Sequence, residues 1–299
     1  PVEKPAEQPV PRRLPPWLTV RLPKRQPIDD VQQLMRERRL HTVCEEARCP
    51  NLWECWTKKT ATFMIMGDTC TRSCRFCAVK TGRGGPLDPS EPAQVADASA
   101  ALGLRHVVVT SVNRDELENG GAEHFAATIH ALRERLPRTV IEVLTPDFLG
   151  KTEAIQIVVD ARPHVFNHNI ETVPRLYRRV RPQARYSRSL ELLRYVKQAN
   201  PNIYTKSGLM VGLGETQDEV LALMRDLRAH NVDIVTIGQY LKPGKGYLEV
   251  EEYIHPDIFA QYKRAGEEMG FLFIASGPFV RSSYNAIEFS EKMELIKGS

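Results

Sequence analysis

The chain has 299 residues, of which 42% are hydrophobic and 26% are charged, the composition of an ordinary globular protein. This excludes a wholly disordered chain, a collagen-like chain and a small disulfide-stapled scaffold. The formal net charge is only +4 and the basic residues form no recognition-helix signature, so we expect no nucleic-acid partner. No apolar run reaches about 18 residues, so we expect no transmembrane helix and no membrane partner. The start lacks a signal-peptide pattern, which favours a cytoplasmic protein, although a removed transit peptide would leave the same sequence.

The first part of the chain is rich in proline. Residues 1–27 hold eight of the 21 prolines, and proline fixes φ and lacks a backbone donor, so we expect an extended arm without a helix. Trp17 and Leu18 are the side chains that would hold this arm on a surface. Residues 28–40 predict a short helix, because aspartates stand at its start and arginines near its end.

From residue 61 onward, short β-rich runs alternate with helical patterns. The predicted strands are residues 61–67, 106–111, 140–145, 164–170, 204–213, 233–241 and 271–277. The clearest helical patterns are residues 122–136, 189–199 and 216–229, and a last helix is expected at about 285–297. Thr216 and Glu219 predict a capping box. Apolar runs separated by helices indicate parallel strands, so we predict an α/β fold, a partial TIM-like (β/α)6 barrel. No G-x-G-x-x-G follows the first strand, which argues against a dinucleotide-binding fold.

All six cysteines lie between residues 44 and 77, in two groups of three. Cys44, Cys49 and Cys55 precede the first predicted strand, and a second group follows it. Such clustering indicates metal ligation rather than disulfides. Three thiolates leave one position of a four-coordinate site open, as a centre that meets a substrate requires. The alternative is a structural zinc site with a fourth ligand from elsewhere in the chain.

The second group has a more specific pattern. Cys70-x3-Cys74-x-Phe76-Cys77 resembles the signature of the radical S-adenosylmethionine (SAM) superfamily. The resemblance implies a [4Fe–4S] cluster on the three cysteines, whose free iron binds SAM, with Phe76 at the cofactor site. It implies that one electron cleaves SAM and that the resulting 5′-deoxyadenosyl radical removes hydrogen from unactivated carbon. A cofactor must carry that step, since side-chain acid–base chemistry cannot.

Polar and glycine residues at predicted strand ends fit the same superfamily. Residues 208–215 resemble its glycine-rich fifth-strand motif, and Gly212 is expected at SAM, although glycines at strand ends are common. Glu171 ends the fourth strand and is expected to accept hydrogen bonds from ribose, the alternative being a carboxylate at a helix N-terminus. The residues expected at the amino-acid end of SAM follow the second strand; they are Ser111, Asn113 and Arg114.

Two further segments resemble the lipoyl synthase family. One is the C-x4-C-x5-C spacing of the first cysteine group, and the other is Arg281-Ser282-Ser283-Tyr284-Asn285-Ala286. The family often has His where this chain has Asn285. The resemblance implies a second, auxiliary [4Fe–4S] cluster, held by the first three cysteines and Ser283. From the residues alone, the two serines would be turn or capping hydroxyls.

The resemblance also implies a reaction and partners. Two sulfur atoms would enter C6 and C8 of an octanoyl-lysine, and the auxiliary cluster would be consumed as their source. The substrate would be a lipoyl carrier domain, from a 2-oxoacid dehydrogenase E2 or a glycine cleavage H protein. Ferredoxin or flavodoxin would supply electrons. Six arginines between residues 175 and 188 would steer an acidic carrier, the alternative being a solvated helix face; they are Arg175, Arg178, Arg179, Arg181, Arg185 and Arg188.

The chain therefore divides into three parts. Residues 1–60 form an N-terminal extension with the auxiliary-cluster cysteines, residues 61–277 the radical SAM barrel, and residues 278–299 a C-terminal extension with the serine motif and a helix. Two other interpretations stay open. One is another sulfur-inserting or rearranging radical SAM enzyme, similar to biotin synthase. The other is a non-enzymatic iron–sulfur or zinc scaffold, which would have two closed sites and would not cleave SAM.

Overall fold

The computed structural model describes residues 14–19, 40–42, 60–283 and 286–297. An eight-stranded sheet has the order β1-β2-β5-β6-β7-β8-β9-β10. Its strands are β1 (His41–Thr42), β2 (Thr60–Ile65), β5 (His106–Ser111), β6 (Val140–Leu144), β7 (Val165–Asn167), β8 (Tyr204–Val211), β9 (Ile234–Gln239) and β10 (Phe273–Gly277). Strands β2 to β10 pair in parallel, and β1 pairs antiparallel with β2.

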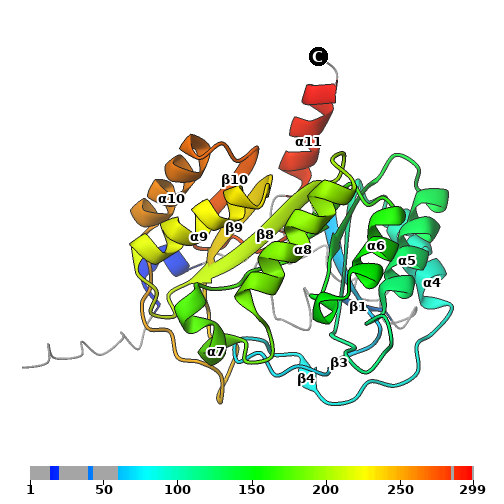
Figure 1. The fold of residues 1–299 in the computed structure, drawn as a ribbon, viewed down its shortest axis with the longest axis horizontal. Coiled ribbons are helices and arrows are strands. Elements are labelled where there is room, and N and C mark those ends of the chain that lie inside the picture. Colours follow the sequence, from blue (N-terminus) through cyan, green and yellow to red (C-terminus); the bar gives the residue numbers. More distant parts are fainter. Residues whose placement is uncertain (1–13, 20–39, 43–59, 284–285, 298–299) are drawn as a thin grey trace, which may run out of the picture.

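At least one α-helix lies between each two consecutive parallel strands, and six helices cover the outside of the sheet. These helices are α4 (Glu91–Ala101), α5 (Ala122–Arg135), α6 (Thr152–Asp160), α8 (Tyr186–Ala199), α9 (Gln217–Ala229) and α10 (Pro256–Glu268). The described sheet thus contains six βα units and a seventh parallel strand, and β10 does not pair with β2. The predicted partial barrel is confirmed (Figure 1). Thr216 and Glu219 form the predicted capping box of α9.

The outer face of the sheet and the helices form one apolar core. Alternate strand residues such as Phe63, Val107 and Val109 point into this core together with Phe125 and Leu132 of α5. Alternation sends the intervening residues to the inner face of the barrel. Both faces are buried, which explains why the strands appear in the sequence as nearly continuous apolar runs.

The inner face carries a buried polar layer near the N-terminal ends of the strands. The Glu142 carboxylate on β6 accepts hydrogen bonds from Lys206 Nζ at 2.8 Å and from Asn167 Nδ2 at 3.1 Å. His106 Nε2 lies 3.2 Å from the same carboxylate. Burial alone would raise the pKa of Glu142, but the neighbouring Lys206 and His106 lower it to about 2. The floor of the barrel therefore contains a buried ion pair, where barrels of this kind commonly have layers of branched apolar side chains.

Helix α11 (Ala286–Lys297) covers this floor. Ser290 on α11 lies 2.6 Å from His106 Nδ1, and Phe289 packs against Val165 and Ile234, which begin β7 and β9. Figure 1 shows α11 at one end of the barrel and the short strands β3 (Thr69–Cys70) and β4 (Lys80–Thr81) at the other. The predicted C-terminal helix is confirmed, and its packing places it opposite the cysteine loop.

The segment after β10 returns along the open side of the barrel. Gly238 on β9 lies so close to it that a Cβ there would collide with the carbonyl oxygen of Val280. Further along, Ser282 Oγ accepts a hydrogen bond from Asn169 Nδ2 at 2.6 Å, and Ser283 Oγ accepts one from Thr62 Oγ1 at 2.9 Å. Contacts to β9, to β2 and to the end of β7 thus fix this segment.

The described part of the N-terminal arm is held through Trp17 and Leu18, as predicted, but the expectation that the arm contains no helix is wrong. Pro16–Leu18 forms a 3-10 turn, because proline at a first helical position loses no hydrogen bond. Leu18 is buried, and Trp17 contacts His255 edge-on with ring centroids 5.0 Å apart. Nearly all of the predicted helix at residues 28–40 lies outside the described residues. No helix in the described part of the chain is long and apolar enough to cross a membrane.

We predict that Gly238→Ala destabilises the fold by about 1–3 kcal/mol, because the added methyl group must displace Val280. Gly85→Ala is the matched control, since a Cβ at Gly85 meets nothing within 4 Å. Urea denaturation of the two variants measures the difference. Equal stabilities would show that the segment after β10 does not pack as described.

Candidate functional site

The second cysteine group lies at the C-terminal ends of the strands, the edge that carries chemistry in such barrels. Cys70 ends β3, whose pairing with β4 closes the loop that holds all three cysteines. Thr71 N donates to Asn113 O at 3.0 Å after β5, and Arg75 N donates to Val180 O at 2.9 Å. The loop is therefore attached both to the sheet and to helix α7 (Tyr177–Val180).

Cys70, Cys74 and Cys77 are free, half-buried thiols. Backbone N–H groups of Arg72 and Asn113 donate to Cys70 Sγ at 3.4 and 3.3 Å. Burial raises the pKa of Cys77 to about 12 and raises that of Cys74 as well, so metal binding must release protons from these thiols. No three His, Cys, Asp or Glu side chains of the described residues are arranged as a metal site as they stand. Ligation by all three cysteines is therefore still a proposal.

Arg72, between the first two cysteines, fixes the loop to the barrel. Its side chain is 2% exposed, and its Nε and Nη2 donate to the Asp115 carboxylate at 2.7 and 2.9 Å. Nη2 also donates to Asp147 Oδ1 at 2.5 Å. Burial alone would raise the pKa of Asp147, but the hydrogen bond and charge of Arg72 hold it well below its usual value.

The turn that carries Asp147 has an unusual backbone. Phe148 and Leu149 have φ values of 45° and 56°, which bulky residues rarely adopt. Asp147 Oδ1 accepts a hydrogen bond from Leu149 N at 3.1 Å and so supports the turn. Met66 and Glu171, just after β2 and β7, also have positive φ values. Strained residues of this kind cluster at functional sites.

Several buried polar atoms at the same edge have no hydrogen-bond partner. They are Ser111 Oγ and Asn113 Oδ1 near the end of β5, Thr145 Oγ1 after β6 and Asn169 Oδ1 after β7. Buried polar atoms are nearly always paired in folded proteins. Unpaired donors and acceptors beside a thiol loop are suited to binding a polar ligand. Two of them belong to Ser111 and Asn113, which the sequence predicted to contact SAM.

Three other predicted cofactor residues differ in their surroundings. Phe76 is half-buried and packs on the core. Glu171 accepts from Asn169 Nδ2 at 3.1 Å, and its pKa is raised by burial. Gly212 has φ +100°, but the space of its missing side chain is taken by Gln239 and the Glu252 carbonyl. The close approach expected there is thus to this chain itself, and cofactor contact at Gly212 rests on resemblance alone.

The side chain of Arg114 is hydrogen-bonded to other groups of this chain. Its guanidinium donates to Met66 O at 3.0 Å, Gly85 O at 2.6 Å and Glu116 Oε1 at 2.6 Å. It fastens the segments around the cysteine loop to the end of β5. We therefore omit Arg114 from the residues proposed to contact SAM.

The arginines of residues 175–188 do not form one solvated patch. Arg175 pairs with Glu219 at 2.7 Å, Arg179 pairs with Glu251, and Arg188 pairs with Asp147 at 3.1 Å. Arg181 is buried beside the cysteine loop. Of the six arginines in the predicted basic stretch, Arg181 is thus buried and Arg188 is half-buried, so these two do not contribute to a solvated face. Arg178 and Arg185 are exposed and have no ion-pair partner in the described part of the chain.

The two predicted auxiliary-cluster segments are described unequally. Cys44, Cys49 and Cys55 lie outside the described residues. Ser283 lies at the inner face of β2, held by Thr62, and Arg281 donates to Val280 O at 2.7 Å. The structure thus brings Ser282 to Asn169 and Ser283 to Thr62, contacts that turn chemistry alone would not have predicted.

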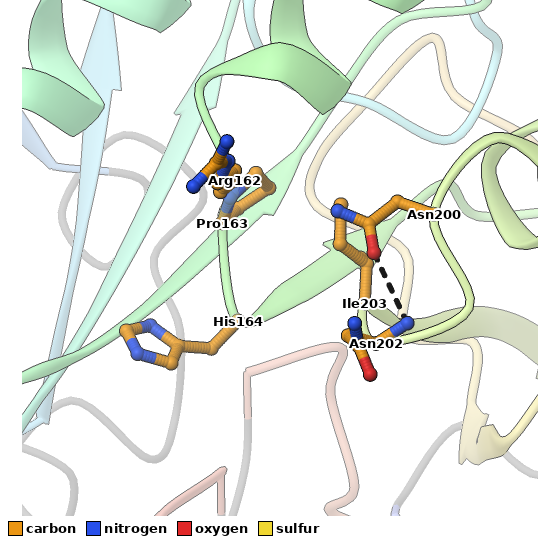
Figure 2. A pocket seen from close by; sticks show the side chains of 6 residues that line it. All are labelled: Arg162, Pro163, His164, Asn200, Asn202 and Ile203. Carbon is orange, nitrogen blue, oxygen red and sulfur yellow. Dashed lines mark hydrogen bonds between the residues drawn. The ribbon is translucent and has the colours of Figure 1, made fainter.

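A separate hollow of about 440 Å³ lies at the other end of the barrel. Figure 2 shows its lining by the segments that precede β7 and β8; the residues are Arg162, Pro163, His164, Asn200, Asn202 and Ile203. Asn202 N donates to Asn200 Oδ1 at 3.1 Å there. Strand starts are far from the cysteine loop, so this hollow is not part of the candidate site.

Comparison with known proteins agrees with this geometry. The family model of the radical SAM superfamily matches residues 64–227, and that of the N-terminal domain of lipoyl synthase matches residues 3–49. Lipoyl synthase of Rubrobacter xylanophilus is 60% identical over 93% of this chain and 86% of its own. That of Chromobacterium violaceum is 56% identical over 91% and 87%.

Solved structures share the fold at low identity. Methylornithine synthase has a TM-score of 0.55 at 13% identity, over 85% of this chain and 83% of its own. Streptococcus suis SuiB bound to S-adenosylmethionine has a TM-score of 0.53 at 12% identity, over 81% and 57%.

We predict that Asp147→Asn destabilises the protein by about 3–5 kcal/mol, because it removes the buried carboxylate that Arg72 and Arg188 share and leaves Asp115 as their one remaining carboxylate partner among the described residues. Asp97→Asn, which alters an exposed pair with Arg135, should change stability by less than about 1 kcal/mol. Thermal denaturation distinguishes the two. Since the folded-state pKa of Asp147 is lowered, its stabilisation is present above about pH 4 and is lost as pH falls further. A stability difference between wild type and Asp147→Asn that did not shrink in acid would contradict this assignment.

Proposed function

Because this chain belongs to the lipoyl synthase family of the radical SAM superfamily, we propose that it inserts sulfur at C6 and C8 of an octanoyl-lysine on a carrier protein. The chain is a radical SAM enzyme of that class. When bound, one [4Fe–4S] cluster with SAM would supply a radical able to remove hydrogen, and a second cluster would supply the sulfur. Cys70, Cys74 and Cys77 hold the first cluster in this proposal.

The observation that carries the proposal is the thiol loop at the C-terminal edge of the barrel, bordered by unpaired buried polar atoms. Asn113 joins both features, since its N–H donates to Cys70 Sγ and its side-chain oxygen is unpaired. Ser111 and Asn113 would bind the amino-acid end of SAM, and Glu171 would accept from ribose. Phe76 and Gly212 complete the proposed cofactor set.

Cys44, Cys49, Cys55 and Ser283 would hold the auxiliary cluster. The position of Ser283 supports this, because its partly buried hydroxyl contacts Thr62 of β2, the strand that precedes the cysteine loop. Serine gives iron a hard oxygen ligand where thiolate is usual, and we expect that bond to be the weakest of the four. We further propose the division into residues 1–60, 61–277 and 278–299.

The partners follow from the reaction. The carrier would be a 2-oxoacid dehydrogenase E2 domain or a glycine cleavage H protein, and ferredoxin or flavodoxin would donate electrons, in the cytoplasm. Arg178 and Arg185 are exposed and unpaired among the described residues, whereas Arg175 and Arg179 pair with carboxylates of this chain. We therefore assign the docking of an acidic carrier to Arg178 and Arg185.

The decisive test is an anaerobic assay of the reconstituted protein with SAM, a strong reductant and an octanoyl-lysine peptide. We expect a peptide with two added sulfurs, formed together with 5′-deoxyadenosine, by mass spectrometry. Cys55→Ala should still cleave SAM but insert no sulfur, and Cys74→Ala should do neither. SAM cleavage without thiolated peptide in the wild type would favour a different radical SAM reaction, such as one similar to biotin synthase. Neither product, from protein that holds both clusters, would favour the scaffold interpretation.

A second assay tests the docking residues. Arg178→Glu with Arg185→Glu should raise the KM for a whole carrier domain several-fold, with little effect on the KM for the peptide, because steering acts on the charge of the whole partner. Arg105→Glu, before β5 at the opposite end of the barrel, is the control. Equal effects on carrier and peptide would contradict docking at these arginines.

A further inference from the structure

Arg181 is a buried arginine at the cysteine loop. It is 8% exposed, and it follows helix α7, whose last residue, Val180, accepts the hydrogen bond from Arg75 of the loop. Its Nη1 donates to Asn169 O at 2.7 Å, to Ile170 O at 3.3 Å and to Tyr177 Oη at 3.3 Å. These acceptors satisfy one nitrogen of the guanidinium but neutralise none of its charge.

No carboxylate of the described residues lies within 4 Å of Arg181, in contrast to the other buried arginines of the site. Arg72 has Asp115 and Asp147, and Arg114 has Glu116. Arg181 Nε is buried without a partner, and Nη1 makes every hydrogen bond that this guanidinium forms in the described part of the chain. Buried charges in proteins are normally paired, because leaving water is costly. The carboxylates of Glu171 and Asp147 act on Arg181 only from beyond ion-pair distance, so no carboxylate of the described residues is in direct contact with this guanidinium.

The charge of Arg181 acts on the candidate site. The Cys74 thiol and the Glu171 carboxyl both lie near enough to Arg181 to interact with its charge. Asn169, whose carbonyl Arg181 binds, holds Ser282 through its side chain and has an unpaired side-chain oxygen. Arg181 therefore lies between the thiol loop and the end of β7, where the proposed cofactor would bind.

We propose that Arg181 is the counter-charge for an anionic group bound at the cysteine loop. This inference rests on the proposed function, which supplies two anionic groups at the loop: the cluster held by the thiolates and the carboxylate of SAM. Arg181 is a binding or positioning residue accordingly, and it is distinct from the exposed arginines assigned to docking. The competing explanation is structural, since Arg181 also fixes the backbone carbonyls of Asn169 and Ile170.

The test compares reconstituted Arg181→Met and Arg181→Lys with the wild type. Equilibrium dialysis measures the Kd of SAM and of decarboxylated SAM, and an EPR-monitored titration without SAM measures the reduction potential in a Cys55→Ala background. If the anion is the SAM carboxylate, Arg181→Met weakens SAM binding about tenfold or more and abolishes the preference over decarboxylated SAM. If the anion is the cluster, Arg181→Met makes the potential more negative and retains that preference.

Arg181→Lys keeps the positive charge, so it should restore most of the SAM affinity or of the reduction potential that Arg181→Met changes. If the role of Arg181 were purely structural, keeping the charge would not restore either quantity. Arg175→Met removes an exposed arginine of the same segment and should alter neither quantity. The proposal is overturned if Arg181→Met leaves both the SAM affinities and the potential within error, or if folded Arg181→Lys behaves as Arg181→Met. Failure of the proposed function would be seen separately, as a wild-type protein that assembles no cluster on Cys70, Cys74 and Cys77.

Discussion

The buried ion pair of Arg72 with Asp147 governs the position of the cysteine loop. The loop packs on the core through Phe76 and Val79, and the charged side chain of Arg72 inside it adds the attachment to the ends of the strands. Arg72 reaches Asp115 after β5 and Asp147 after β6, and Arg188 of α8 completes the charge balance. One guanidinium thereby fixes the loop after β2 to the ends of two neighbouring strands, and the strained turn after Asp147 is held in the same contact.

The two ends of the barrel are built differently and serve different purposes. At the floor, the buried Glu142 is balanced by Lys206 and His106, and α11 closes it through Ser290. At the opposite edge, polar atoms such as Asn113 Oδ1 are buried without partners. Complete pairing stabilises a fold, whereas unpaired buried groups cost free energy unless a ligand satisfies them. The floor balances its charges within the chain, although Asn167 Oδ1 in the same layer is itself unpaired, whereas several polar atoms around the cysteine loop have no partner among the described residues.

The polar interior also explains the path of the segment after β10. Ser282 and Ser283 would be costly inside an apolar barrel, but here Asn169 and Thr62 donate to their hydroxyls. Gly238 provides the space for Val280 to approach β9. Residues distant in the sequence, on β2, β9 and after β7, therefore cooperate to hold a serine motif at the mouth of the barrel.

The sequence by itself determined the order of strands and helices, the capping box of α9 and the placement of Cys70, Cys74 and Cys77 after the first parallel strand. Local signals suffice for these features, because periodicity and capping act over a few residues. Tertiary structure decided the environment of each charge. Arg175, Arg178 and Arg181 are equivalent in the sequence, yet one is ion-paired, one exposed and one buried beside the thiols. Their partners come from distant segments, and only packing settles which guanidinium meets a carboxylate and which is left to meet a ligand.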